Sequence, residues 1–261
     1  MARHCQATER TSLRQVRTEL SQARAHLERT LARLQAVVDL PDNPRLLDIG
    51  SAQGRILIVA GQMGLDVVGV EPYEPARAQA QQLAEELHTP IHIQPGWAEK
   101  IDQPDASFNI VHALSVLEHV KDPGAVFAEA YRVLQPGGVL WFCTTNGLCP
   151  RQNEIAFFPC FGWYPDLLKR HIMRWTAEHH PAWIGHTDTP AMHWFTPATT
   201  RAMLRDAGFE NVFDRWDLRR VEEGNKAVSL ALRAIRRCRI LRWLADMCVP
   251  ASIYAAVKPM K

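Results

Sequence analysis

The stretch LLDIGSAQGR, residues 46–55, decides the expected fold. It begins as a short apolar strand, passes Asp48, and breaks into small residues before an apolar run with helical spacing. A strand that turns through glycine into a helix is the opening of a crossover between parallel strands. The stretch also raises a chemical question, because an acid stands at the end of an apolar strand, just before the glycine of a tight loop.

Residues 45–145 repeat this alternation of short apolar runs and helical patterns. Strands separated by stretches long enough for helices predict a parallel sheet that is covered on both faces. A later helix at 197–207 and strands at 210–216 and 251–257 complete the pattern. The sequence therefore predicts a doubly wound α/β domain, which we assign to residues 41–261.

Residues 1–40 form an expected helical extension before this domain. Apolar side chains recur there at steps of three and four, with arginine and glutamate around them. This heptad-like stripe fits either a helix docked on the core or a coiled coil that makes a homodimer. The stripe consists of Leu13, Val16, Leu20, Ala23, Leu27, Leu31, Leu34 and Val38.

Residues 147–195 differ from the rest of the chain, because they are rich in aromatic side chains and contain five histidines. Ligands of open α/β sheets bind at the carboxyl ends of the strands, and an insertion after the fifth strand lies at that end. We expect an irregular aromatic lid or substrate wall here, with a purely structural flap as the alternative. The histidine spacing matches no standard zinc pattern, so no metal site is expected.

The composition bounds the class of protein. The chain has 261 residues, 22% charged residues and a formal net charge of +2, which gives no case for a nucleic-acid partner. No apolar run reaches the roughly 18 residues that cross a bilayer. Six cysteines without a C-x-x-C pair favour neither a zinc cluster nor a disulfide framework. A polar, basic N-terminus without an apolar signal core predicts a cytoplasmic protein.

The loop after Asp48 reads D-x-G-x-A-x-G, with Gly50, Ala52 and Gly54 as its small residues. Small residues let a ligand approach the backbone, and the next helix offers free N–H groups. A dinucleotide pyrophosphate is one candidate, but its fingerprint is G-x-G-x-x-G and the acid would repel it. A carboxylate beside exposed N–H groups suits a zwitterionic amino acid instead. Because Glu71 ends the second strand and can accept both hydroxyls of a ribose, the implied ligand is an amino acid joined to a nucleoside.

Several motifs resemble, in order, those of class I S-adenosylmethionine-dependent methyltransferases over about residues 45–146. LLDIGSAQG is similar to the family's first motif, VVGVEP to its second, and FNIVHALSVLEHV to its fourth-strand motif. EAYRVLQPGGVLWFCTTN resembles its helix, turn and fifth strand, and GWAEKI stands where the family often has G-D-A-E. The resemblance implies a Rossmann-like, seven-stranded, mostly parallel sheet, with S-adenosylmethionine as cofactor and S-adenosylhomocysteine as product.

The same resemblance implies a set of cofactor contacts. The first motif would border the methionine end, Glu71 the ribose, and the GWAEKI turn the adenine. Trp97 stands where an adenine-binding aspartate is usual, so we expect the adenine to stack on its indole. The expected cofactor-binding residues are Asp48, Gly50, Ser51, Ala52, Gly54, Glu71, Trp97, Ala98, Glu99, Ala113 and Leu114.

The acceptor class is sought in the region after the fourth strand. HALS differs from the N-P-P-Y-like tetrapeptide of base amino-methyltransferases, and we find no paired-glutamate loop of protein arginine methyltransferases. LSVLEHV looks closest to the ubiquinone-biosynthesis O-methyltransferases, which favours O-methylation of a small or amphipathic molecule. That branch has an acid three residues before Glu-His for a divalent cation, whereas Ser115 precedes Glu118 and His119 here. We expect no metal, and name His193 and His119 as candidate general bases.

Residues 226–247 predict a basic amphipathic helix. Such a helix fits either docking with a solvated basic face or peripheral contact with an anionic membrane, which would imply a lipid-like substrate. An RNA or protein methyltransferase, and a catalytically silent cofactor-binding scaffold, are the alternative functions. The stripe expected to face the core is Leu230, Ala231, Ala234, Cys238, Leu241 and Ala245, and the other arc holds Arg233, Arg236, Arg237, Arg239, Ile240, Arg242 and Trp243.

Overall fold

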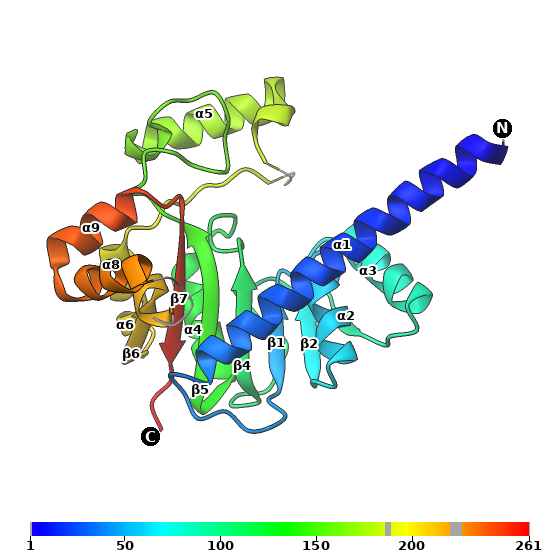
Figure 1. Cartoon of the computed structure of the whole chain (residues 1–261), viewed down its shortest axis with the longest axis horizontal. Helices are drawn as coiled ribbons and strands as arrows, with labels where there is room; N and C mark the ends of the chain where they lie inside the picture. Colours follow the sequence, from blue (N-terminus) through cyan, green and yellow to red (C-terminus); the bar gives the residue numbers. More distant parts are fainter. Residues whose placement is uncertain (1, 186–188, 220–225, 261) are drawn as a thin grey trace.

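A computed structural model describes residues 2–185, 189–219 and 226–260 of the chain. Within these ranges, seven strands form one sheet in the order β3-β2-β1-β4-β5-β7-β6. Figure 1 labels the strands of this sheet from β6, at one edge, to β2. β1 to β5 pair in parallel, and β7 runs antiparallel between β5 and β6. The predicted Rossmann-like, mostly parallel α/β fold is confirmed. The strands are β1 (Leu46–Ile49), β2 (Val67–Val70), β3 (His92–Gln94), β4 (Phe108–Leu114), β5 (Leu134–Thr145), β6 (Asn211–Asp214) and β7 (Ala251–Val257).

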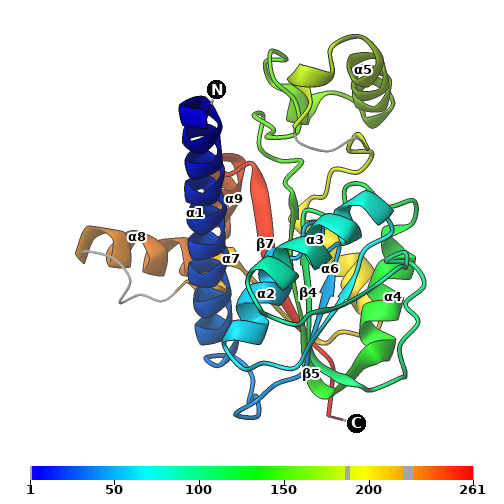
Figure 2. The same ribbon diagram turned by 90° about the vertical axis from the view of Figure 1, so that its right-hand side faces the viewer.

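Helices cover both faces of the sheet (Figure 2). α1 (Ala2–Leu34) and α2 (Arg55–Gln62) pack on one face, and α4 (Pro123–Val133) and α6 (Pro197–Asp206) pack on the other. α3 (Glu74–Glu86) connects β2 to β3. Since both faces are covered, β1 and β2 are buried along their whole length and β4 along most of it, and apolar side chains predominate in them.

Local side chains fix where the helices of the second face begin. Asp122 accepts hydrogen bonds from the main-chain nitrogens of Gly124 and Ala125, at 2.9 and 3.2 Å, and Pro123 occupies the first turn of α4. Thr196 and Thr199 form a capping box at the start of α6. Both devices satisfy N–H groups that a helix start leaves without partners.

The N-terminal helix α1 docks on the sheet. Leu27 and Leu34 are fully buried with β1, β4 and α2, and Leu20 and Leu31 pack partly buried beside them. Glu19 adds an ion pair to Arg55 at 2.6 Å. The stripe of apolar residues therefore serves intramolecular packing from Leu20 onward. Leu13 lies outside the residues whose side chains the structure describes.

The insertion at 147–195 is less irregular than expected. It contains the short helices η1 (Phe161–Trp163) and η2 (Pro181–Trp183) and a full helix, α5 (Asp166–His179). Phe161, Met173 and Trp194 bury one another in a separate apolar cluster. The helix forms because Met173 and Thr176 give α5 a buried side, which the aromatic composition alone did not reveal. The insertion lies beyond the carboxyl ends of the parallel strands (Figures 1 and 2).

The expected single helix over 226–247 is two helices. After α7 (Arg215–Leu218), α8 (Lys226–Arg237) and α9 (Arg239–Met247) meet at Cys238, whose backbone is extended at φ −113° and ψ 113°.

The predicted core stripe is wrong at Leu230, Ala231 and Leu241, which are exposed, whereas its members Ala234, Cys238 and Ala245 are half-buried. Leu230 is 69% exposed and Leu241 is 42% exposed, whereas Leu232 is buried. Arg236 points inward and donates to the carbonyl oxygens of Trp216 and Asp217, which sets this orientation.

We expect Leu27→Ala to lower the free energy of unfolding by about 2–5 kcal/mol, because it leaves a cavity between α1 and the sheet. Urea denaturation followed by circular dichroism measures this. The matched control on the same helix is Gln22→Ala, an exposed position, for which we expect a change within about 0.5 kcal/mol. Equal effects of the two substitutions would contradict the docking of α1.

Candidate active site

The loop between β1 and α2 has an unusual backbone. Gly50, Ala52 and Gly54 all have positive φ angles, of 71°, 45° and 70°. A Cβ on Gly50 would lie 2.5 Å from Cγ2 of Val116, and one on Gly54 would lie 2.7 Å from Cβ of Ala80. Both positions therefore require glycine, because a side chain at either one would clash with Val116 or Ala80. Such a bare backbone lets a ligand approach the N–H groups at the start of α2.

Glu71 ties this loop to the end of β2. Its Oε2 accepts a hydrogen bond from the main-chain nitrogen of Ala52 at 2.9 Å, and Oε1 accepts one from Tyr73 at 3.0 Å. The side chain is nearly buried, at 9% exposure. Each carboxylate oxygen has a second lone pair, so both oxygens can still accept from a ligand hydroxyl. Glu71 thus shapes the loop and keeps acceptor capacity at the same point.

Asp48 on β1 is paired with a histidine of β4, which in turn lies beside a histidine of α1. Its Oδ1 lies 2.7 Å from Nδ1 of His112, and both side chains are buried. Because a carboxylate oxygen only accepts, Nδ1 of His112 is the donor in this contact. Nε2 of His112 lies 3.4 Å from Nε2 of His26 on α1. Burial, with the charge of His112 adding to it, lowers the pKa of His26 to about 4, so His26 is neutral at pH 7.

The GWAEKI turn presents an exposed indole. Trp97 is 64% exposed, whereas Ala98 beside it is buried. Glu99 has a partner within the protein, because its Oε1 accepts a hydrogen bond from the main-chain nitrogen of Lys121 at 2.8 Å. The turn is closed by a hydrogen bond from the nitrogen of Lys100 to the carbonyl of Trp97 at 3.1 Å. The indole face is therefore open for stacking.

The carboxyl end of β4 leads into a buried carboxyl group. Ala113 and Leu114 end the strand, and Ser115 has a positive φ of 52°. Glu118 is 2% exposed and accepts a hydrogen bond from Oγ1 of Thr144 at 2.9 Å. Burial raises the pKa of Glu118 from its ordinary value of 4.5 to about 7, and the charge of Glu154 from the insertion adds to the rise.

The two candidate general bases occupy different surroundings. His193 lies with Nε2 2.9 Å from the carbonyl oxygen of Val120, which requires a proton on that nitrogen. His119 has a buried Nδ1 with no partner among the described residues. Burial lowers the pKa of His119, so its neutral form predominates at pH 7. Within the described part of the chain, no group of three or more His, Cys, Asp and Glu side chains is placed to hold a metal ion.

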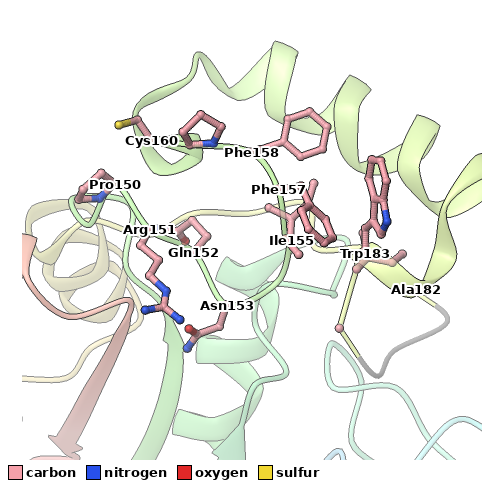
Figure 3. Close-up of a pocket in the computed structure, with 14 residues that line it drawn as sticks. Pro150, Arg151, Gln152, Asn153, Ile155, Phe157, Phe158, Cys160, Ala182 and Trp183 are labelled. Atoms are coloured by element: carbon pink, nitrogen blue, oxygen red, sulfur yellow. The ribbon is translucent and has the colours of Figure 1, made fainter.

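The insertion carries an open concavity of about 1010 Å³. Figure 3 shows Phe157 and Trp183 on one side of it, with Arg151 and Asn153 toward the other end. The rings of Phe157 and Trp183 have centroids 5.1 Å apart, and Trp183 also stacks on His180 at 4.1 Å. The lining thus combines aromatic surface with a guanidinium and amides, which suits a ligand with an apolar body and polar groups.

A family model described as a methyltransferase domain matches residues 13–213, well over half of the chain. The chain belongs to the class I S-adenosylmethionine-dependent methyltransferases. A ubiquinone biosynthesis O-methyltransferase of Rhodopseudomonas palustris is 34% identical over 179 residues, which make up 67% of this chain and 65% of that protein. The chain spans 58% and 65% of the lengths of two curated relatives that it matches.

Solved structures show the same methyltransferase fold. An S-adenosylmethionine-dependent methyltransferase of Mesorhizobium loti has a TM-score of 0.56 and 19% identity, with 86% of this chain and 95% of that one covered. Phosphoethanolamine N-methyltransferase 2 of Haemonchus contortus, solved with S-adenosyl-L-methionine, has a TM-score of 0.56 and 18% identity. That match covers 88% of this chain and 52% of the other.

Three residues that contact this candidate site were not found from the sequence. His112 stands opposite Asp48 in the register of β1 and β4, so a strand alignment could have found it. His26 lies beside His112, and Thr144 donates a hydrogen bond to Glu118. Both contacts join segments that are far apart in the sequence, so local patterns do not reveal them. The glycine loop and Glu71 do meet at one end of the sheet, as expected, while Ala113 and Leu114 turn their side chains into the two core layers.

We expect the stability of this methyltransferase to fall between about pH 4.5 and 7 because of Glu118. In that interval the unfolded carboxyl is ionised while the folded one keeps its proton, so the folded state binds more protons and the free energy of unfolding falls as the pH rises. Glu118→Gln cannot ionise and should remove a pH-dependent loss of up to about 3 kcal/mol. Urea denaturation at pH 5 and pH 7.5 measures it.

Glu85→Gln, at an exposed position of α3, is the control and should follow the wild-type pH dependence. If Glu118→Gln also showed the wild-type dependence, the raised pKa of Glu118 would be refuted.

Proposed function

We propose that this protein transfers a methyl group from S-adenosylmethionine to an oxygen atom of a small or amphipathic acceptor. The observation that carries the proposal is the bare loop 50–54, held by Glu71 at the end of the sheet where the aromatic insertion lies. The names of the curated relatives support oxygen as the acceptor atom. When bound, the cofactor supplies an electrophilic methyl group on a sulfonium; the chain supplies binding, orientation and exclusion of water.

The cofactor site fits this ligand at three points. The loop N–H groups and Asp48 would hold the carboxylate and ammonium of the methionine end, and the remaining lone pairs of Glu71 would accept the ribose hydroxyls. The exposed face of Trp97 would stack on adenine, between Ala98 and Glu99. The full proposed set is Asp48, Gly50, Ser51, Ala52, Gly54, Glu71, Trp97, Ala98, Glu99, Ala113 and Leu114.

The acceptor hydroxyl must lose a proton during transfer. His119 is neutral at pH 7, and its Nδ1 is buried with no partner among the described residues, so it could accept from an acceptor hydroxyl only if the surrounding side chains moved. His193 is the weaker candidate, because its Nε2 already donates to Val120 and only Nδ1 remains as an acceptor. Glu118, with its pKa near 7, lies buried between the ends of β4 and β5 and can exchange a proton close to neutral pH.

The finer form of the proposal concerns the substrate and the partners. The aromatic concavity supports an acceptor with an apolar body, which includes lipid-linked molecules that are reached at a membrane surface through residues 226–247. A homodimer through residues 1–40 is a further proposal, limited to the part of α1 before Leu20, because the residues from Leu20 onward pack on the sheet.

Asp48→Ala and Glu71→Ala should each weaken binding of S-adenosylhomocysteine at least tenfold, because each removes one ligand contact and, for Glu71, the tether of the loop. Isothermal titration calorimetry measures the affinity, and tenfold corresponds to about 1.4 kcal/mol. Asp66→Ala, just before the amino end of β2, is the control and should bind as the wild type does. Unchanged affinity in both site variants, with folding intact, would refute the site assignment.

Labelled methyl groups from S-adenosylmethionine should enter a product when the protein is added to an extract of the source cell. We expect the label in the organic phase, because the aromatic concavity favours an apolar acceptor. Label confined to the aqueous phase would turn the search to sugars, small metabolites, RNA or protein. Cofactor binding without any labelled product would indicate a silent scaffold. The Glu71→Ala variant is the negative control.

A further inference from the structure

The outer side of α8 and α9 is an exposed apolar surface with a basic border. Ile240 is 69% exposed, Trp243 50% and Leu244 47%, and Leu230 and Leu241 lie on the same pair of helices. We call this surface the α8–α9 face, defined by Leu230, Arg233, Arg237, Arg239, Ile240, Leu241, Trp243 and Leu244. Single exposed apolar residues are ordinary, but a cluster of this kind on two adjoining helices marks an interaction site.

The arginines of these helices divide into two groups. Arg236 donates to backbone carbonyls of α7, and Arg242 binds Asp214 at 3.0 Å and Asp217 at 2.6 Å. Both are therefore used to attach the helices to the domain. The others, Arg233, Arg237 and Arg239, are exposed and make no hydrogen bond or ion pair with any described residue. Their charges are free for a partner.

The inward side holds the two helices firmly. Asp246 is the single acidic residue of the sequence from 226 to 247, and it accepts a hydrogen bond from Nε1 of Trp216 at 2.7 Å. Asn146, at the end of β5, donates to the carbonyl oxygens of Asp246 and Val249, each at 2.8 Å. The α8–α9 face thus presents free positive charge and apolar side chains, with no acid of its own, on anchored helices.

We propose that the α8–α9 face binds the surface of an anionic lipid bilayer. Guanidinium groups pair with lipid phosphates, while tryptophan and aliphatic side chains enter the boundary between headgroups and acyl chains. A second copy of the chain fits less well, because a two-fold contact places the same patch on both sides and would set arginines against arginines. No helix in the described ranges is long and apolar enough to cross a bilayer, so the contact is peripheral.

The position of this face relates it to the insertion. Asn146 directly precedes the insertion and also holds the end of α9, so one residue connects the two features. This inference does not rest on the proposed methyl transfer, since lipid binding needs neither cofactor nor acceptor.

Sedimentation of the full chain with vesicles tests the inference. We expect binding to vesicles of phosphatidylcholine mixed with phosphatidylglycerol, much weaker binding to phosphatidylcholine alone, and weakening with added salt. The double variant Ile240→Asp/Leu244→Asp and the triple variant Arg233→Gln/Arg237→Gln/Arg239→Gln should each lower binding at least about tenfold. Leu167→Asp, which changes a residue 80% exposed on α5, is the matched control and should bind normally.

Far-ultraviolet circular dichroism of the same variants shows that they are folded, and this control does not depend on the proposed function. The inference is overturned if the wild-type chain ignores anionic vesicles, or if both variants bind them fully. Loss of binding in Leu167→Asp alone would place the lipid contact on the insertion instead. A dimer in light scattering that both face variants abolish, without vesicle binding, would make the face a contact between copies.

Discussion

The carboxylate of Glu71 is the contact on which the candidate site depends. It joins the loop after β1 to the turn after β2, through hydrogen bonds to Ala52 and Tyr73. The loop can adopt its left-handed backbone because Gly50 and Gly54 have no Cβ, and it keeps that shape because Glu71 accepts from it. One side chain therefore sets the shape of the surface and retains lone pairs for a ligand.

Two buried carboxyl groups, those of Asp48 and Glu118, connect this site to distant segments of the chain. Asp48 is linked through His112 to His26, so the N-terminal helix closes the site from below. Glu118 is linked to Thr144 and lies near the insertion, where burial raises its pKa toward neutrality. Buried polar groups of this kind are costly without partners, which explains why each lies against a hydrogen-bonding side chain from another segment.

The insertion and the α8–α9 face are two further features attached to the sheet. The insertion has its own small core, around Phe161 and Met173, and therefore holds an aromatic concavity without support from the sheet. α8 and α9 are attached by Arg236 and Arg242, which leaves the other arginines outward. The two features are connected at the end of β5 by Asn146, which precedes the insertion and donates to the carbonyl oxygens of Asp246 and Val249.

The order of strands and helices, the glycine loop and the position of Glu71 followed from the sequence, because strand alternation and turn chemistry are local properties. The break at Cys238, the inward turn of Arg236 and the pairing of Asp48 with His112 did not follow from it. Helical spacing over 226–247 predicted one apolar stripe toward the core, but the stretch is two helices and the contacts of Arg236 with α7 decide which side of α8 meets the domain. The sequence by itself thus determined the fold and the glycine loop after β1. Only the tertiary structure decided which charges are paired and which remain free, because those pairings join residues far apart in the chain.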